Sequence, residues 1–150
     1  MMRARLTKSL PMVLFAALTV ACGESHITSS LKLKGPVGTY SSIILYSTSA
    51  ADPSIKQPNS GALTITLAAD GTTTGHLHLD RFNGNPAVDA DMAGTWVQTG
   101  NTITFNQSAD TFVRSMPFTI EKINDNVWFL TGDDVFAGTR FNVKLAQSTE

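Results

Sequence analysis

Apolar and polar residues alternate in short stretches along most of the chain after residue 36. Every second residue is aliphatic in LTITL (63–67) and in HLHL (76–79), and TRFNVKL (139–145) follows the same pattern with one aromatic residue. This period of two predicts β-strands that bury one face. No stretch of this region repeats convincingly every 3.6 residues, so the pattern indicates an all-β domain.

One turn in the middle of the chain predicts a strand register. If Gly100-Asn101 is a two-residue turn, Trp96 pairs with Phe105. The same register pairs Gln98 with Ile103. Both Trp96 and Gln98 are then expected to face the interior.

The expected strands number about eight or nine. They lie at 39–46, 63–67, 72–80, 96–99, 102–106, 112–115, 118–123, 127–131 and 138–145, and the turns between them include Asp70-Gly71, Asn124-Asp125-Asn126 and Gly132-Asp133-Asp134. Each hairpin follows directly on the previous one, which favours an up-and-down meander over a Greek key. The expected fold class is therefore all-β, an antiparallel up-and-down barrel of about eight to nine strands. Longer loops at 47–60 and 81–92 are expected at its ends.

The aromatic residues of this domain have two possible roles. A barrel of this size either fills itself with side chains or holds one small apolar ligand. The candidates for lining such a pocket are Tyr40, Trp96, Gln98, Phe105, Trp128 and Phe141, and Phe112 belongs to the same aromatic set. A packed core is the alternative for the aromatic residues. Gln98 would need a polar partner if it faced inward, which favours a wet or ligand-holding interior.

The first residues of the chain have the organisation of a secretory signal peptide. Arg3, Arg5 and Lys8 form a positive segment, and residues 10–20 are an uncharged apolar run of eleven residues. A membrane-spanning helix needs about 20 apolar residues, so this run is too short to cross a bilayer. A cleaved signal peptide is the better interpretation.

The end of the apolar run resembles a bacterial lipobox. In Leu18-Thr19-Val20-Ala21-Cys22 a small residue precedes the only cysteine of the chain. The resemblance implies a lipoprotein signal peptide at 1–21, cleavage before Cys22, acylation of its thiol, and attachment to the outer face of a membrane in the cell envelope. Gly23 follows where many inner-membrane lipoproteins carry Asp, which implies the outer membrane in a Gram-negative cell. Residues 22–36 are expected to form the lipidated tether and 37–150 the barrel domain.

Composition and charge narrow the class of protein further. The chain has 150 residues, a length that suits one globular domain, and 15% of them are charged. Removing residues 1–21 takes away three of 11 Lys and Arg residues and none of the 12 Asp and Glu residues, which leaves a net charge of −4. No basic stretch follows residue 8, so nucleic acid is not an expected partner. A single cysteine excludes a disulfide scaffold.

The strand pattern also resembles the lipocalin-like small barrels found among bacterial lipoproteins. Gly38-Thr39-Tyr40 opens the first strand where lipocalins carry Gly-x-Trp, and Gly94-Thr95-Trp96 repeats the motif with tryptophan. Gly138-Thr139-Arg140-Phe141 closes the pattern, and Arg140 matches a late arginine that packs over the aromatic residue. The resemblance covers most of residues 37–145. It implies a closed barrel of about eight strands.

Two histidines and a carboxylate form a weak candidate metal site. His76, His78 and Asp80 lie two residues apart, so on a strand they project from one face. Imidazole and carboxylate groups ligate transition metals. Leu77 and Leu79 are expected on the opposite, buried face. The alternative is therefore that the face with the histidines is simply the solvated outer wall of the barrel. We expect no metal here.

The loop that follows is rich in oxygen ligands. Five Asp and Asn side chains lie within twelve residues, namely Asp80, Asn83, Asn85, Asp89 and Asp91. Their spacing does not match an EF-hand, and Asn-Gly and Asn-Pro are residues that turns require. Calcium binding is therefore the less favoured alternative.

No motif in the chain indicates catalysis. A Gly-x-Ser-x-Gly elbow, a phosphate-binding loop and a His-Glu-x-x-His motif are all missing from the sequence. We therefore expect no enzyme and no cofactor. The expected function is a membrane-anchored barrel that binds a small apolar or amphipathic ligand. The alternative is an interaction module with a filled barrel that contacts another envelope protein.

Overall fold

The computed structural model describes residues 35–124 and 127–148. The expected signal peptide, Cys22 and most of the expected tether lie outside these residues. The elements in chain order are β1 (Gly38–Ser49), β2 (Lys56–Pro58), β3 (Gly61–Leu67), β4 (Thr72–Leu79), β5 (Val88–Thr99), β6 (Thr102–Gln107), α1 (Phe112–Ser115), β7 (Phe118–Asn124), β8 (Val127–Phe136) and β9 (Thr139–Gln147).

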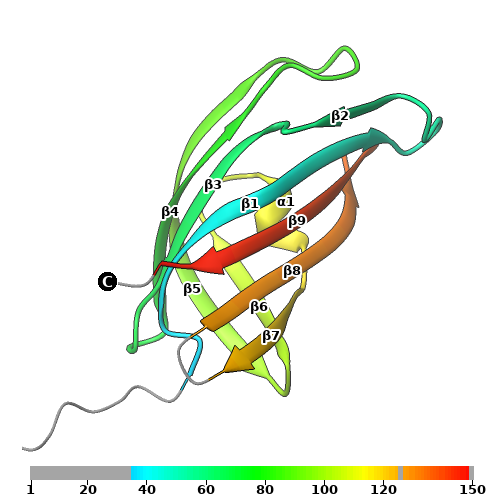
Figure 1. Cartoon of the computed structure of the whole chain (residues 1–150). Coiled ribbons are helices and arrows are strands. Elements are labelled where there is room, and N and C mark those ends of the chain that lie inside the picture. Colours follow the sequence, from blue (N-terminus) through cyan, green and yellow to red (C-terminus); the bar gives the residue numbers. More distant parts are fainter. Residues whose placement is uncertain (1–34, 125–126, 149–150) are drawn as a thin grey trace, which may run out of the picture. The chain divides into compact units, whose positions relative to one another are not determined.

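The strands form one closed antiparallel barrel (Figure 1). Each strand from β3 to β8 pairs with the next one along the chain, and β9 pairs with β1 to close the ring. β3 pairs with residues 38–41 of β1 and β2 pairs with residues 46–48, so these two strands occupy successive parts of one side of β1. The result is an eight-stranded barrel with β2 as an additional short strand. The predicted all-β, up-and-down antiparallel fold is confirmed.

The register predicted around Gly100-Asn101 is also confirmed. Trp96 pairs with Phe105, Gln98 with Ile103 and Thr99 with Thr102. The alternation predicted in the earlier strands holds as well, because Leu63 and Leu77 are opposite one another and both are fully buried. The side chains that fill the interior are Tyr40, Leu45, Leu63, Ile65, Leu67, Leu77, Met92, Ile103, Phe105, Phe112, Val113, Met116, Phe118, Ile120, Leu130, Phe141, Val143 and Leu145.

The stretch 112–115, expected as a strand, is a short helix. β6 and β7 pair only through Thr102–Thr119 and Ile103–Phe118 and then separate. α1 lies between them in the chain and contacts β6 and β8. Phe112 and Val113 of this helix are buried, so the helix places bulky side chains in the interior where the two strands part.

Several other boundaries differ from the sequence prediction, among them the expected loop 47–60, which contains the end of β1 and the short strand β2. Gly132-Asp133-Asp134 is not a turn, because β8 runs through it to Phe136 and the turn falls at Ala137-Gly138. A side chain at Gly132 would overlap the thioether of Met116, so this glycine gives room to a core residue rather than forming a turn. Residues 88–92 were expected in a loop, but they form the first part of β5 and pair with β4.

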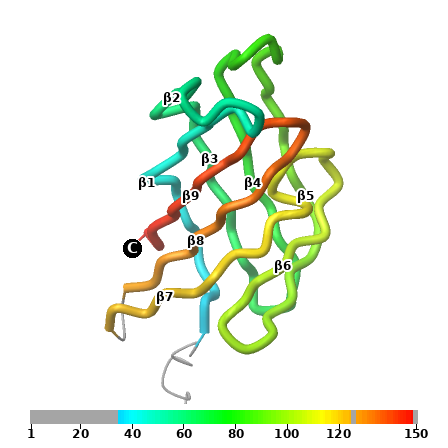
Figure 2. Tube along the Cα trace, turned by 90° about the vertical axis from the view of Figure 1, so that its right-hand side faces the viewer, coloured from blue at the N-terminus to red at the C-terminus, as the bar shows by residue number. Residues whose placement is uncertain are grey.

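The chain enters the barrel at one of its two ends. Pro36, the last residue of the expected tether, is buried, and its carbonyl accepts a 2.8 Å hydrogen bond from the Tyr40 hydroxyl. Burial raises the pKa of Tyr40 well above its ordinary value. The indole Nε1 of Trp96 donates to the carbonyl of Ala68 at 2.9 Å. Figure 2 shows this cyan entry segment at one end, and the green β4–β5 loop and the β8–β9 turn at the opposite end.

Candidate functional site

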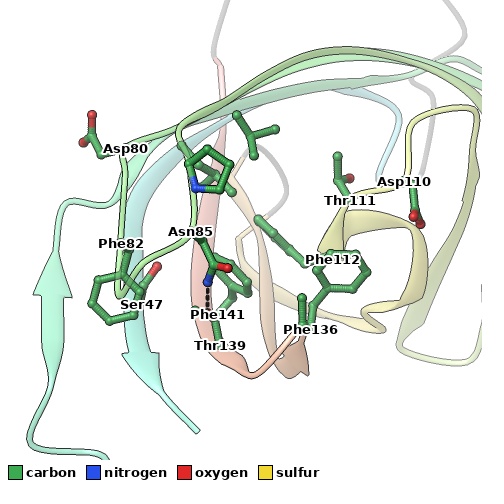
Figure 3. A pocket seen from close by; sticks show the side chains of 14 residues that line it. Ser47, Asp80, Phe82, Asn85, Asp110, Thr111, Phe112, Phe136, Thr139 and Phe141 are labelled. Atoms are coloured by element: carbon green, nitrogen blue, oxygen red, sulfur yellow. Dashed lines mark hydrogen bonds between the residues drawn. The ribbon is translucent and has the colours of Figure 1, made fainter.

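A cavity of about 190 Å³ lies at the end of the barrel remote from the chain entry. Its walls come from the ends of β1, β4, β5, β8 and β9, from the β4–β5 loop and from the start of α1 (Figure 3). The apolar lining residues are Leu79, Phe82, Pro86, Val88, Phe112, Phe136, Ala137 and Phe141. The polar lining residues are Ser47, Asp80, Asn85, Asp110, Thr111 and Thr139.

Phe112 and Phe141 form the inner side of the cavity. Their rings are stacked, with centroids 4.4 Å apart and planes 16° apart. Both side chains are buried, and both belong to the cluster that fills the barrel. The stacked pair therefore belongs both to the cavity wall and to the packed interior.

The β4–β5 loop forms one side of the cavity. Phe82 and Asn85 exchange two backbone hydrogen bonds, of 2.8 and 3.2 Å, around Asn83-Gly84. Asn83 and Gly84 both have positive φ, of 47° and 83°, as a tight hairpin turn requires. The side-chain amide of Asn85 donates to the Thr139 hydroxyl at 3.4 Å, so this loop is linked to β9 (Figure 3).

The β8–β9 turn forms another side. Ala137 and Gly138 have φ values of 47° and 76°, which is the conformation of a two-residue hairpin turn. The turn aligns Phe136 and Thr139 as a cross-strand pair, and both residues line the cavity. Glycine suits this conformation, whereas alanine adopts it at some cost.

One of the six expected pocket residues lines this cavity, namely Phe141. Tyr40 and Phe105 are buried in the core, where Phe105 makes an edge-to-face contact with Phe118. Trp96 and Trp128 are partly buried against the core but do not line the cavity. The Trp128 ring lies under the ammonium of Lys122, with 5.3 Å between Nζ and the ring centroid.

Gln98 does not face the interior as expected. Its side chain is exposed, and its Nε2 donates to the carbonyl of Gly100 at 2.8 Å. The pairing of β4 with β5 ends at Thr72 and Thr95, so β5 continues past Thr95 without its β4 neighbour. A side chain at Gln98 therefore reaches solvent even though its partner Ile103 is buried.

Several lining residues were not identified from the sequence. Phe82 lies in a loop of Asn, Gly and Pro residues, and a large apolar side chain in such a loop is the signal that points to a pocket wall. Phe136 directly precedes a turn, where the strand pattern assigns no face. Phe112 belongs to the aromatic set for which the sequence left core and pocket open, and the structure places it in both the core and the cavity wall.

The candidate metal residues form cross-strand pairs instead. His76 Nδ1 lies 2.9 Å from Asp91 Oδ1 and its Nε2 lies 3.1 Å from Asp89 Oδ1. His78 Nδ1 lies 2.8 Å from Asp89 Oδ2, and its Nε2 is 3.7 Å from Asp80 Oδ1. The side chains of His76 and His78 on β4 and of Asp89 and Asp91 on β5 are exposed on the outer face, and Asp80 directly follows β4. Each imidazole nitrogen is thus directed at a carboxylate.

His78 and Asp89 each stabilise the charged form of the other. The hydrogen bond with Asp89 raises the pKa of His78, and the same bond lowers the pKa of Asp89. Within residues 35–124 and 127–148, no group of three or more His, Cys, Asp or Glu side chains is arranged to hold a metal ion. Of the calcium candidates, Asp80 and Asn85 line the cavity, whereas Asp89 and Asp91 lie on the outer wall.

Arg140 does not take the position that the family resemblance implied. Its guanidinium lies 3.3 Å from the carboxylate of Asp133, and both side chains are about half exposed. Trp96, the aromatic residue of the second Gly-x-Trp-like motif, instead donates its indole N–H to the backbone of Ala68.

No protein-family model matches this chain, and no curated protein matches its sequence. In the part of the chain that the structure describes, no helix has the length and apolar character needed to cross a bilayer.

Proposed function

We propose that the barrel binds one small apolar or amphipathic molecule in the cavity beside Phe112 and Phe141. The observation that carries this proposal is a cavity of about 190 Å³ with four phenylalanine side chains in its walls. A protein cavity of about 150 Å³ takes up benzene, so this space suits one ring with a short substituent. The interior beyond the stacked pair is filled, so a longer molecule would extend out of the mouth.

The family of this domain and its cellular place are part of the same proposal. We propose a lipocalin-like lipoprotein of the bacterial envelope, attached to the membrane through acyl chains on Cys22 and without enzymatic activity. The order of positive segment, apolar run, small residue and cysteine supports the anchor. The chain enters the barrel at Pro36, at the end opposite the cavity, so the cavity lies away from the point where the expected tether joins the barrel (Figure 2).

The alternative is an interaction module that contacts an envelope protein. The filled interior of the barrel favours it, because a carrier for a larger ligand would leave that space open. The cavity favours the ligand-binding function, because four phenylalanine side chains line it.

A titration with benzyl alcohol tests the binding function. We would record ¹H–¹⁵N NMR spectra of the full chain carrying Cys22→Ser, which removes its only thiol. Saturable shifts are expected for the amides of Val88, Phe112 and Thr139, and no shifts for Gly71 and Gly100 at the opposite end.

A matched pair of variants on β5 gives the control. Val88→Trp places a large ring in the cavity wall and should abolish the saturable shifts. Val97→Trp makes the same change at a position that is 60% exposed, and it should leave them intact. Uniform shifts, or equal binding by Val88→Trp, would reject the cavity as a binding site. The alternative would be favoured if the protein purified from its host carried no small molecule and could be cross-linked to an envelope protein.

A further inference from the structure

The charged residues that line the cavity are all acidic. Asp80 and Asp110 contribute to the lining, and Lys, Arg and His do not. In Figure 3 Asp80 stands on the side of the view that carries Phe82, and Asp110 stands on the side that carries Phe112. Both residues are exposed, so they belong to the rim rather than to the floor.

These two carboxylates are weakly neutralised by the protein itself. In the described ranges, Asp110 forms no ion pair and no side-chain hydrogen bond. Asp80 has His78 at 3.7 Å, but the same imidazole makes a closer contact of 2.8 Å with Asp89. Arg140, on the strand that carries Thr139 and Phe141, is directed to Asp133. The charged residues among those that line the cavity are therefore both negative.

The aromatic walls of the cavity also favour a positively charged ligand. Phe82, Phe112, Phe136 and Phe141 line the cavity, and the face of an aromatic ring attracts a cation. A bound anion would lie near these rings and the two acidic lining residues together. The neutral hydroxyls of Ser47, Thr111 and Thr139 are compatible with either sign.

From this charge complementarity we propose that the cavity selects a small organic cation, with one ring or a comparable apolar body in the cavity and a protonated amine at the rim. This proposal rests on the proposed function, because it names the chemical class of ligand for the same cavity. The volume of about 190 Å³ limits the apolar body to one ring and a short arm.

Three probes with one shared ring test the charge preference. Benzylamine, benzyl alcohol and benzoate are titrated at pH 7 and low salt, where the first is a cation and the last an anion. We expect benzylamine to bind about threefold more tightly than benzyl alcohol, and benzoate about threefold more weakly, as suits partly exposed charges. Salt at about 0.5 M should compress both ratios, because it screens exposed charges.

Paired charge variants locate the effect. In Asp80→Asn/Asp110→Asn the three affinities should converge, because the two carboxylates that distinguish the probes are gone. Asp70→Asn/Asp91→Asn removes the same charge from residues that do not line the cavity, and it should keep the order of the probes.

The outcomes separate this proposal from the proposed function. Equal binding of the three probes, a preference for benzoate, or an equal loss of preference in Asp70→Asn/Asp91→Asn would overturn the cation preference and leave the cavity a binding site. Failure of all three probes to bind would overturn the proposed function, and the cation preference with it.

Discussion

The ring of Phe112 stacks on the ring of Phe141, with 4.4 Å between centroids. Phe112 begins the short helix α1, and Phe141 lies on β9, so the contact joins the helix to the barrel wall. On one side of the pair the interior is filled with side chains, and on the other the cavity opens. The pair therefore serves both the stability of the barrel and the shape of the site.

Truncation of this pair should destabilise the domain strongly. Phe112→Ala removes a side chain that is 1% exposed, and loss of a buried phenylalanine costs about 3–5 kcal/mol. Urea unfolding measures the change. Phe82→Ala, at a partly exposed loop position of the same cavity, should cost less than about 1 kcal/mol. A loss of unfolding free energy in Phe112→Ala as small as the loss expected for Phe82→Ala would contradict the role of Phe112 in the core.

The side-chain amide of a buried glutamine has no partner among the described residues. Gln107 is 3% exposed, and within residues 35–124 and 127–148 neither its Nε2 nor its Oε1 makes a hydrogen bond. It lies in a row with Gly94 and Thr73 across β6, β5 and β4, and the Thr73 hydroxyl is also buried without a partner. An unsatisfied buried polar group costs about 1–3 kcal/mol.

We therefore expect Gln107→Met to raise the free energy of unfolding, by about 1 kcal/mol. Gln147→Met provides the control, because Nε2 of Gln147 donates to the Val37 carbonyl at 2.8 Å and its loss should lower stability. Both changes are read from urea unfolding. A loss of stability in Gln107→Met would mean that the amide is satisfied by a molecule buried in the barrel.

Gly94 allows two strands to approach closely. A Cβ at this position would overlap the carbonyl oxygen of Asn106 on the neighbouring strand β6. Gly94→Ala should therefore lower the free energy of unfolding by about 2 kcal/mol or more, since overpacking forces the backbone to shift. Gly84→Ala is the control: its Cβ meets open space, and its positive φ should cost about 1 kcal/mol. A smaller loss for Gly94→Ala than for Gly84→Ala would contradict the close approach.

The His78–Asp89 pair should make stability depend on pH. The folded-state pKa of His78 is raised above 6.5, so its contribution is complete below that value and is lost as the pH rises through the folded pKa. The folded-state pKa of Asp89 is lowered below 3.8, so its contribution is present above that value and is lost as the pH falls through the folded pKa. The His78–Asp89 pair therefore contributes most to stability between the two ordinary pKa values, 3.8 and 6.5.

Melting temperatures at pH 5.5 and pH 8.5 measure this effect. The native chain should lose more thermal stability between the two pH values than His78→Gln does. Asp89→Asn should reduce the pH dependence of the melting temperature in the same way, because it removes the carboxylate that pairs with His78. High salt should weaken the effect in the native chain, since both side chains are exposed. An unchanged pH dependence in both variants would exclude the pair as its source.

The barrel was predictable because its signals are local. Alternation within one strand assigned Leu63 and Leu77 to the interior, and the turn at Gly100-Asn101 determined the pairing of Trp96 with Phe105. Gln98 was misplaced because its exposure depends on where β4 ends, and the pattern of β5 carries no information on that.

The cavity was not predictable for the same reason. Leu79, Phe112 and Phe136 meet there from three distant parts of the chain, and none of them has a spacing relationship with another. Their meeting depends on α1 and on the separation of β6 from β7, which follow from packing in the closed barrel. Local periodicity thus predicted the scaffold, while the site required its three-dimensional closure.

The proposed anchor can be tested apart from the cavity. Cys22→Ser removes the thiol that would carry the acyl chains, so the chain should lose its acylation and leave the membrane fraction of its host. In a Gram-negative host, Gly23→Asp should keep the acyl chains but move the protein to the inner membrane. Both variants should bind benzyl alcohol as the native chain does, because the cavity lies opposite the entry at Pro36. Unchanged membrane fractionation of Cys22→Ser would reject the anchor while leaving the binding function intact, since the two rest on separate parts of the chain.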